Sequence, residues 1–265
     1  MVREGRSKTI VTNRQSATDI PRLRVFALRK TKPAGYTLID VSGILGTCAP
    51  SPVTVRTPRG NYVASCVENA WQYSKVYNVD LQGRRLVDER GEPNDAYYEW
   101  ARAGWANLCA VRNPMGTQPR QNGTPFCIGT PRQIGVPICL YCLGPNGEHL
   151  SLYEARRQLF APWYAKSVEH TADFHCLQHK YVAGVRIGLV DHDGWDHIAQ
   201  GLTYDEVMRS NRKMSHAFVL AGLLEDNRYW LAQADANRYT YLPGRVGNGS
   251  RVSSRRTGNV NPTAR

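Results

Sequence analysis

Four residues at helical spacing form the first set that could do chemistry. At about 100° per residue along a helix, they share one face: Glu68, Trp71, Gln72 and Lys75. The ring could stack on a base, the carboxylate could meet a sugar hydroxyl or a water, and the ammonium could meet a phosphate. A structural role is the alternative, because Glu68 could close a capping box with Ser65 and Trp71 could lie in the core. Glu68 and Lys75 would then form only a solvated face.

Three carboxylates in the segment LVDHDGWDH form the second candidate set: Asp191, Asp193 and Asp196. They follow an apolar stretch, and a polar cluster at a strand end is a common active-site position because the sheet fixes the base of the loop. Carboxylates this close would raise one another's pKa, which suits a general acid. Their oxygens could instead bind Mg²⁺ or Ca²⁺, or the segment could be an Asx-type turn with Gly194.

The cysteines are the third set. The spacing Cys139-x-x-Cys142 fits one half of a zinc site. The other half would have to come from an irregular group, namely His170, His175, Cys176 and His179. Buried free thiols are the expectation, because Cys139 lies in an apolar run and the total of seven cysteines is odd. Glycine-rich phosphate-binding motifs and the G-x-S-x-G motif are missing, so we expect neither a metal nor a cofactor.

Short strands and helices must position these sets, and the hydrophobic pattern predicts them in mixed order. We expect strands over residues 21–27, 36–44, 53–56, 61–64, 136–143 and 185–191. We expect helices over residues 65–77, 95–108, 150–160 and 163–183, a short one capped by Thr203, and a core helix over 215–224. Pro58 and Gly60 supply the turn of the hairpin between 53 and 64.

The predicted fold is α+β: a single helix-rich domain with a small antiparallel sheet or hairpin. Composition divides the chain into a basic arm over residues 1–35, a globular domain over 36–243 and a disordered basic tail over 244–265. Within the globular part, the Gly/Pro-rich stretch 113–148 is expected to be a flap or an insertion. A chain of 265 residues with 42% apolar residues can bury a sizeable core.

The net charge of +12 is concentrated at the ends of the chain. Residues 1–35 carry nine Lys or Arg against two acids, and residues 244–265 carry five Arg and no acid. Such arms bind phosphate backbones through counterion release, without reading sequence, so we expect DNA or RNA as a partner. The expected contacts are Arg22, Arg24, Arg29, Lys30, Arg251, Arg255 and Arg256. Solubilising tails, or pairing with an acidic protein, are the alternatives.

The apolar patterning predicts a cytoplasmic protein without membrane contact. No apolar run approaches the roughly 20 residues that a membrane span needs. Residues 1–20 are polar and lack the apolar segment of a secretory signal. The chain contains no internal repeats.

The segment Leu45 to Lys75 resembles the opening of the NADAR family, named for its association with NAD and ADP-ribose. The family has two spaced prolines, a hairpin ending in G-x-x-Y and a helix with S-x-E-H-x-x-Q-x-x-K. The matching residues here are Pro50, Pro52, Gly60, Tyr62, Glu68, Gln72 and Lys75. Asn69 stands where the family has histidine.

Later segments extend the resemblance over roughly residues 40–225. Leu177 with Lys180-Tyr181 is similar to the family's L-x-x-K-F helix. The segments DHDGWD and SNRKMSHAFVLAGLL are similar to its Asp before Trp-Gly and to its closing N-x-L-G turn. Trp195 is followed by Asp196 rather than glycine, the turn from Asn211 is one residue longer, and 113–148 has no clear counterpart.

The resemblance implies an N-glycosidase that cleaves a bond between ribose and a base or amine nitrogen, including ADP-ribose attached to guanine. Such cleavage passes through an oxocarbenium-like state that a carboxylate stabilises, while a second acid protonates the leaving nitrogen. The first carboxylate would be Glu68, and the second Asp193 or Asp196. The substrate would be an ADP-ribose-containing molecule or nucleotide. It would be bound by Trp71, Gln72, Lys75, Lys180, Trp195 and Asn211.

Two readings without catalysis stay open. The chain could hold single-stranded nucleic acid on its basic arms and aromatic face. It could also be a structural subunit, for example of a phage particle, whose arms neutralise nucleic acid. The two acidic sets separate these readings from an enzyme, because a pure binder has little use for carboxylates against phosphate.

Overall fold

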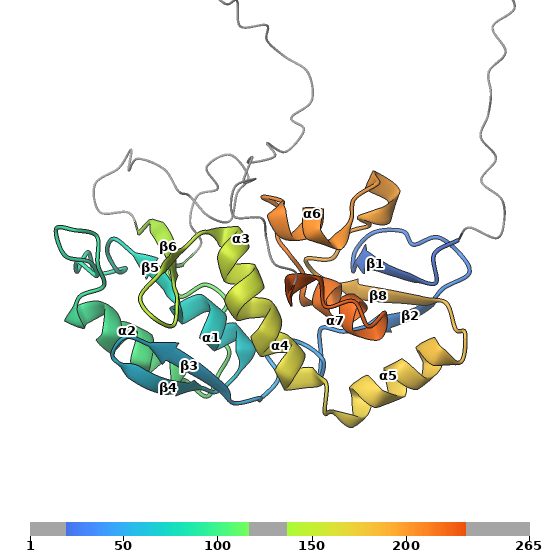
Figure 1. Ribbon diagram of the computed structural model, residues 1–265, viewed down its shortest axis with the longest axis horizontal. Coiled ribbons are helices and arrows are strands. Elements are labelled where there is room, and N and C mark those ends of the chain that lie inside the picture. The colour runs from blue at the N-terminus through green and yellow to red at the C-terminus, as the bar shows by residue number, and fades with distance from the viewer. Residues whose placement is uncertain (1–19, 117–136, 232–265) are drawn as a thin grey trace, which may run out of the picture.

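A helical column runs between two groups of strands (Figure 1). The computed structural model describes residues 20–116 and 137–231, and the remaining residues lie outside the described part. The column is formed by α3 (Leu152–Ala155), the π-helical turn η1 (Arg156–Phe160) and α4 (Ala161–Val168). One group of strands belongs mainly to residues 53–143, and the other combines the start of the described chain with residues 187–191.

A parallel sheet forms the second group. Its order is β1 (Leu23–Ala27), β8 (Ile187–Asp191) and β2 (Thr37–Asp40), and both outer strands run parallel to β8. Every residue of β8 is buried, as expected for the central strand of a covered sheet. The mixture of helices and small sheets agrees with the α+β class, but the sequence did not predict this parallel sheet. No hairpin signal could reveal this sheet, because β8 is separated from both partners by well over a hundred residues.

Antiparallel pairs make up the other group of strands, as the sequence predicts. The hairpin of β3 (Val53–Thr57) and β4 (Gly60–Ala64) turns at Gly60, whose φ is 122°. A second sheet contains β5 (Lys75–Tyr77), β6 (Cys139–Leu143) and β7 (His149–Leu150). Burial alternates along β3, which is the pattern of a strand with one face on the core.

Helix α1 (Val67–Tyr73) is shorter than expected. Its N-cap is Cys66, without a side-chain cap bond, so the expected capping box of Ser65 and Glu68 is wrong. The chain leaves the helix at Ser74 and pairs Lys75 with Cys142 in the β5–β6 ladder. The sequence at 75–77 lacks a helix-stop signal, so only this pairing decides where α1 ends. The N-cap of helix α2 (Asp95–Trp105) is Asn94, whose side chain accepts a hydrogen bond from Tyr97 N.

The remaining helices lie near the predicted segments, with one break. The expected helix over 163–183 is divided at residues 169–171, where Thr171 caps α5 (Ala172–Val182). Thr203 and Glu206 form the expected capping box of α6 (Tyr204–Arg209). Helix α7 (His216–Leu224) is buried along its whole length and packs on β1 and β8. Two single turns complete the described chain, η2 (Ile198–Gln200) and η3 (Tyr229–Leu231).

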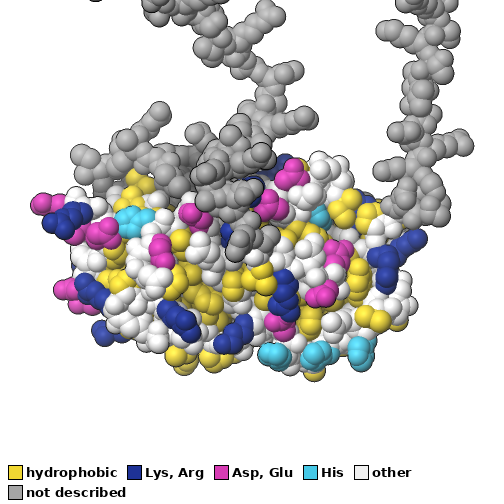
Figure 2. Space-filling view, viewed as in Figure 1, with side chains coloured by type: hydrophobic (Ala, Val, Ile, Leu, Met, Phe, Trp, Pro, Cys, Tyr) yellow, Lys and Arg dark blue, Asp and Glu magenta, His cyan; other side chains and the backbone are white. Residues whose placement is uncertain are grey.

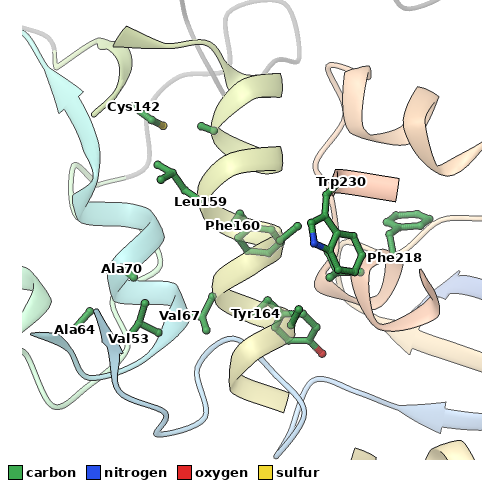
Figure 3. Packing of buried hydrophobic residues seen from close by; sticks show 14 of the residues in the cluster. Val53, Ala64, Val67, Ala70, Cys142, Leu159, Phe160, Tyr164, Phe218 and Trp230 are labelled. Carbon is green, nitrogen blue, oxygen red and sulfur yellow. The ribbon is translucent and has the colours of Figure 1, made fainter. Parts of the chain in front are cut away.

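One hydrophobic core joins the two groups of strands through the column (Figure 3). Phe160 and Tyr164 project from the column, with Val67 of α1 on one side and Phe218 of α7 on the other. Because β1 belongs to the sheet and carries the fully buried Val25, the globular part begins before residue 36, and the predicted boundary of the basic arm is wrong. Among the helices of residues 20–116 and 137–231, none could cross a membrane by length and apolar character.

Candidate active site

Glu68 is fixed at the start of α1 by the loop that precedes it. Its Oε2 accepts a hydrogen bond from Thr47 Oγ1 at 2.8 Å, and its backbone N–H donates to the Thr47 carbonyl at 2.9 Å. Its Oε1 accepts from Gln72 Nε2 at 2.7 Å, one turn further along the helix. The half-buried carboxylate is therefore held by two side chains and is not used to cap its own helix.

Gln72 links Glu68 to Lys75 through its side-chain amide. Lys75 Nζ donates to Gln72 Oε1 at 2.5 Å and lies 5.2 Å from the centre of the Trp71 ring. Burial lowers the pKa of Lys75, and the charge of Glu68 acts in the opposite direction. The four residues predicted to share a face are thus together, although Lys75 belongs to β5 rather than to the helix.

Asp191 is the last residue of the central strand β8 and is buried. Its Oδ2 accepts a hydrogen bond from Ser215 Oγ at 2.6 Å and lies 3.7 Å from His216 Nδ1. The other ring nitrogen of His216 donates to the Val41 carbonyl at 2.8 Å. Asp191 therefore lies where the carboxyl end of a parallel strand commonly supports a site.

Asp193 and Asp196 point to other parts of the molecule. Asp193 forms an exposed ion pair with Lys213 at 3.1 Å. Asp196 forms an ion pair with Arg24 of β1. It accepts one hydrogen bond from Arg24 Nε at 3.2 Å and a second from the same guanidinium. The turn at Gly194 explains this direction, because it packs so tightly on Phe26 of β1 that an added Cβ would lie 2.3 Å from the Phe26 carbonyl oxygen.

The loop over residues 41–48 connects the surroundings of Asp191 to Glu68. The Val41 carbonyl accepts from His216, and Thr47 binds Glu68. Between them, the Leu45 carbonyl accepts from Tyr164 Oη at 2.7 Å. Desolvation raises the pKa of Tyr164, and the charge of Asp191 raises it further. From Val41 to Thr47, the loop thus contacts α7, α4 and α1 in succession.

A row of rings runs alongside this loop from α1 to α7. The centroid of Trp71 lies 5.3 Å from that of Phe160, Phe160 lies 6.4 Å from Tyr164, and Tyr164 lies 5.2 Å from His216. Phe160 and Tyr164 both come from the column at the centre of Figure 3. The row therefore runs from the helix that carries Glu68 to His216, which lies beside Asp191.

Arg112 is a residue of this site that the sequence did not single out. Its Nε donates to Cys48 Sγ at 3.4 Å. That hydrogen bond is the largest cause of a raised pKa for the guanidinium, and the charges of Glu68 and Asp191 both add to the rise. The Arg112 side chain is exposed, and its partner Cys48 directly follows Thr47, the residue that binds Glu68. Arg112 follows α2 without a motif, so no local signal could have marked it.

The predicted substrate residues after β8 lie around a buried arginine. Trp195 Nε1 donates to the Lys213 carbonyl at 3.2 Å, and half-buried Asn211 lies in the same segment. Arg156 donates to the carbonyls of Met208 at 2.9 Å and Ser210 at 2.6 Å, and to that of Arg212. Burial lowers the pKa of Arg156 to about 10. The column thus shapes the segment that carries Asn211.

Lys180 lies apart from the Glu68 group. It lines a pocket of about 260 Å³ between β2 and α5, together with Asp40 and Leu45. The pocket touches the 41–48 loop through Ile44 and Leu45. The structure therefore separates Lys180 from Gln72 and Lys75, with which the family resemblance groups it.

The basic residues of the expected nucleic-acid surface differ in their surroundings. Arg22 donates to the Tyr181 carbonyl and lies 4.7 Å from that ring's centre, and Arg24 pairs with Asp196. Arg29 and Lys30 are exposed. Arg251, Arg255 and Arg256 lie outside the described residues. On the face in Figure 2, basic and acidic side chains alternate over the described surface.

The cysteine and histidine set does not form a metal centre in the described chain. Cys139 and Cys142 are buried in β6, and burial raises the pKa of the Cys142 thiol to about 12. His175 and Cys176 are exposed on α5. Within residues 20–116 and 137–231, no group of three or more His, Cys, Asp or Glu residues could hold a metal ion.

Comparisons of this chain with known proteins found no relative. No protein-family description, curated protein or solved structure matches the chain. The site must therefore be interpreted from its own residues.

Proposed function

We propose that this protein is an N-glycosidase that hydrolyses an N-ribosyl bond and removes ADP-ribose from a modified base in nucleic acid or in a nucleotide. The observation that carries the proposal is the setting of Glu68. Its carboxylate is half-buried and is oriented by hydrogen bonds from Thr47 and Gln72. The NADAR resemblance of residues 45–75 gives the substrate class.

Glu68 is suited to the central step of this reaction. As the N-ribosyl bond breaks, positive charge develops on the sugar, and an oriented carboxylate stabilises that charge more in the transition state than in the ground state. Glu68 would also accept a proton from the attacking water, whose oxygen forms the new bond to the ribose carbon. The released base nitrogen takes up a proton from solvent, and Glu68 returns to solvent the proton it took from the water, so the overall reaction adds OH to the ribose carbon and H to the base.

Asp191 replaces Asp193 and Asp196 as the second acidic residue of the proposal. Those two carboxylates are already paired with Lys213 and Arg24. Asp191 is buried at the end of β8, where it accepts a hydrogen bond from Ser215. We assign it an electrostatic role in stabilising the cationic sugar, because a buried charge is screened less by water.

The remaining α1 residues fit the parts of such a substrate. Trp71 offers an aromatic face to a base, with Lys75 5.2 Å from its ring centre. Gln72 links Glu68 to Lys75, so binding of a phosphate near Lys75 would be coupled to the position of the carboxylate. Trp195 and Asn211 stay as candidate contacts on the segment shaped by Arg156.

The test is release of ADP-ribose by the full chain from NAD, ADP-ribosylated guanosine and ADP-ribosylated DNA. We expect Glu68→Gln to lower the rate at least 100-fold, within the usual contribution of a general base. Glu99→Gln is the matched control, because Glu99 is an exposed acid on α2 paired with Arg84. A Glu68→Gln protein that releases ADP-ribose at the wild-type rate would refute the assignment.

The alternative is a non-catalytic nucleic-acid-binding protein or a phage structural protein, favoured by the basic ends of the sequence. In that case the wild-type chain releases no ADP-ribose from any of the three substrates. Its DNA affinity would fall steeply with salt and would be unchanged by Glu68→Gln. Deletion of residues 244–265 would reduce that salt dependence.

A further inference from the structure

The segment after α2 is fastened to the start of α1 by a single buried side chain. Asn69 is fully buried. Its Nδ2 donates to the carbonyls of Asn107 at 2.8 Å and Cys109 at 3.1 Å, and its Oδ1 accepts from Val111 N at 2.8 Å. Asn69 adjoins Glu68 and Val111 adjoins Arg112, so the amide joins the helix that carries Glu68 to the backbone that carries Arg112.

A fourth bond makes this connection rigid. Asn69 Nδ2 also lies 3.0 Å from Ser65 Oγ, and that hydroxyl itself donates to the Asn107 carbonyl. A buried amide with all its partners in place allows few alternative arrangements. Arg112 thus follows a loop whose backbone is hydrogen-bonded to Asn69 at Asn107, Cys109 and Val111.

The guanidinium of Arg112 retains hydrogen-bonding capacity. Its Nε binds Cys48 Sγ, and within residues 20–116 and 137–231 this is its one hydrogen bond. The two terminal nitrogens form the planar fork that binds phosphate oxygens in pairs. The side chain is exposed, so a ligand can reach it.

We infer that Arg112 binds the diphosphate of the substrate and that Asn69 is the residue that positions it. This inference rests on the proposed function for the identity of the substrate. A diphosphate approaching Glu68 meets a negative charge. Arg112 can offset that repulsion, because it is hydrogen-bonded to Cys48, the neighbour of the Thr47 that binds Glu68.

The experiment measures ADP-ribose binding to the full chain by calorimetry, under conditions where no bond is cleaved. We expect Arg112→Ala to weaken binding at least ten-fold and Arg112→Lys to weaken it less, because a lysine keeps the charge but loses the fork. Arg102→Ala is the matched control, since Arg102 is an exposed cation on α2, and its Kd should change less than two-fold. Wild-type affinity in Arg112→Ala would overturn the inference.

The role of Asn69 is tested by a double-mutant cycle. We expect Asn69→Ala to weaken ADP-ribose binding in the wild-type background but to have no further effect in Arg112→Ala. An equal loss in both backgrounds would show that Asn69 does not act through Arg112. Circular dichroism checks that each variant is folded, and if Asn69→Ala does not fold, the Arg112 variants decide the assignment.

A single-stranded oligonucleotide serves as the second ligand, to distinguish the substrate diphosphate from a nucleic-acid backbone. If Arg112→Ala weakens binding of the oligonucleotide but not binding of ADP-ribose, the assigned ligand is wrong. Failure of the proposed function has a different signature. Wild-type protein would then bind ADP-ribose through Arg112 but release none from any modified base.

Discussion

Thr47 and Glu68 are joined twice, through a side-chain bond of 2.8 Å and a backbone bond of 2.9 Å. The backbone bond supplies a partner to an N–H in the first turn of α1, where helices leave such groups without intrahelical partners. The side-chain bond orients the carboxylate. Thr47 therefore stabilises the start of the helix and sets the geometry of its acidic residue.

Replacing Thr47 by valine should impair the site more than the fold. The substitution keeps the shape but removes the Oγ1 bond to Glu68, at a cost of about 1 kcal/mol. We expect a roughly five-fold fall in ADP-ribose release, measured as kcat/KM, with the backbone bond retained. Thr54→Val, at an exposed position of β3, is the control. Equal activities of the two variants would contradict an orienting role for Thr47.

Ser215 should contribute more to stability than an ordinary helix cap. Its Oγ accepts from Ala217 N at 2.9 Å and donates to the buried Asp191 at 2.6 Å. Loss of a cap costs about 1 kcal/mol, and loss of a bond to a buried charge adds about 2 kcal/mol. We expect Ser215→Ala to lower the free energy of unfolding by about 3 kcal/mol in urea titrations.

Thr203→Ala provides the comparison for Ser215, because Thr203 caps α6 without contacting a buried acid. We expect a loss of about 1 kcal/mol for that variant. A Ser215 variant no less stable than the Thr203 variant would mean that the bond to Asp191 adds nothing.

His197 should make stability depend on pH. Burial lowers its pKa to about 4 from an ordinary value near 6.5, with the charge of Arg24 acting in the same direction. Between pH 6.5 and pH 4, the unfolded state therefore binds more protons at this site than the folded state. The stability due to neutral His197 is present above pH 6.5 and is lost as pH falls toward 4.

The measurement compares wild type with His197→Phe, whose ring can pack on Tyr204 and Phe218 as the imidazole does. We expect the difference in unfolding free energy between the two proteins to change by about 2 kcal/mol from pH 7 to pH 4. A constant difference over that range would show that His197 does not titrate as its burial implies.

Arg24 should act in folding and not in nucleic-acid binding. Its ion pair with Asp196 joins β1 to the turn after β8, and the two side chains are only 16% and 23% exposed. We expect Arg24→Ala to lower the free energy of unfolding by about 2 kcal/mol and to leave the salt dependence of DNA binding unchanged. By contrast, loss of exposed Arg29 and Lys30 should reduce the salt slope if they meet phosphates. If Arg24→Ala reduces the salt dependence of DNA binding, Arg24 does contact the nucleic acid.

The sequence by itself determined the local elements and one half of the site. The turn at Gly60, the cap at Thr203, and the buried runs of β8 and α7 depend on neighbours along the chain, so their pattern could be read directly. Helical spacing likewise placed Trp71 and Gln72 beside Glu68, because side chains three and four apart share a face.

The contacts of the three later acids and the place of Arg112 depend on the tertiary structure. Asp191, Asp193 and Asp196 are equivalent in sequence, but the tight packing of Gly194 on β1 turns Asp196 toward Arg24, while Asp191 remains buried beside Ser215. Arg112 enters the site through the hydrogen bonds of Asn69, which span about forty residues. Such pairings depend on contacts between distant segments, and no periodicity along the chain encodes them.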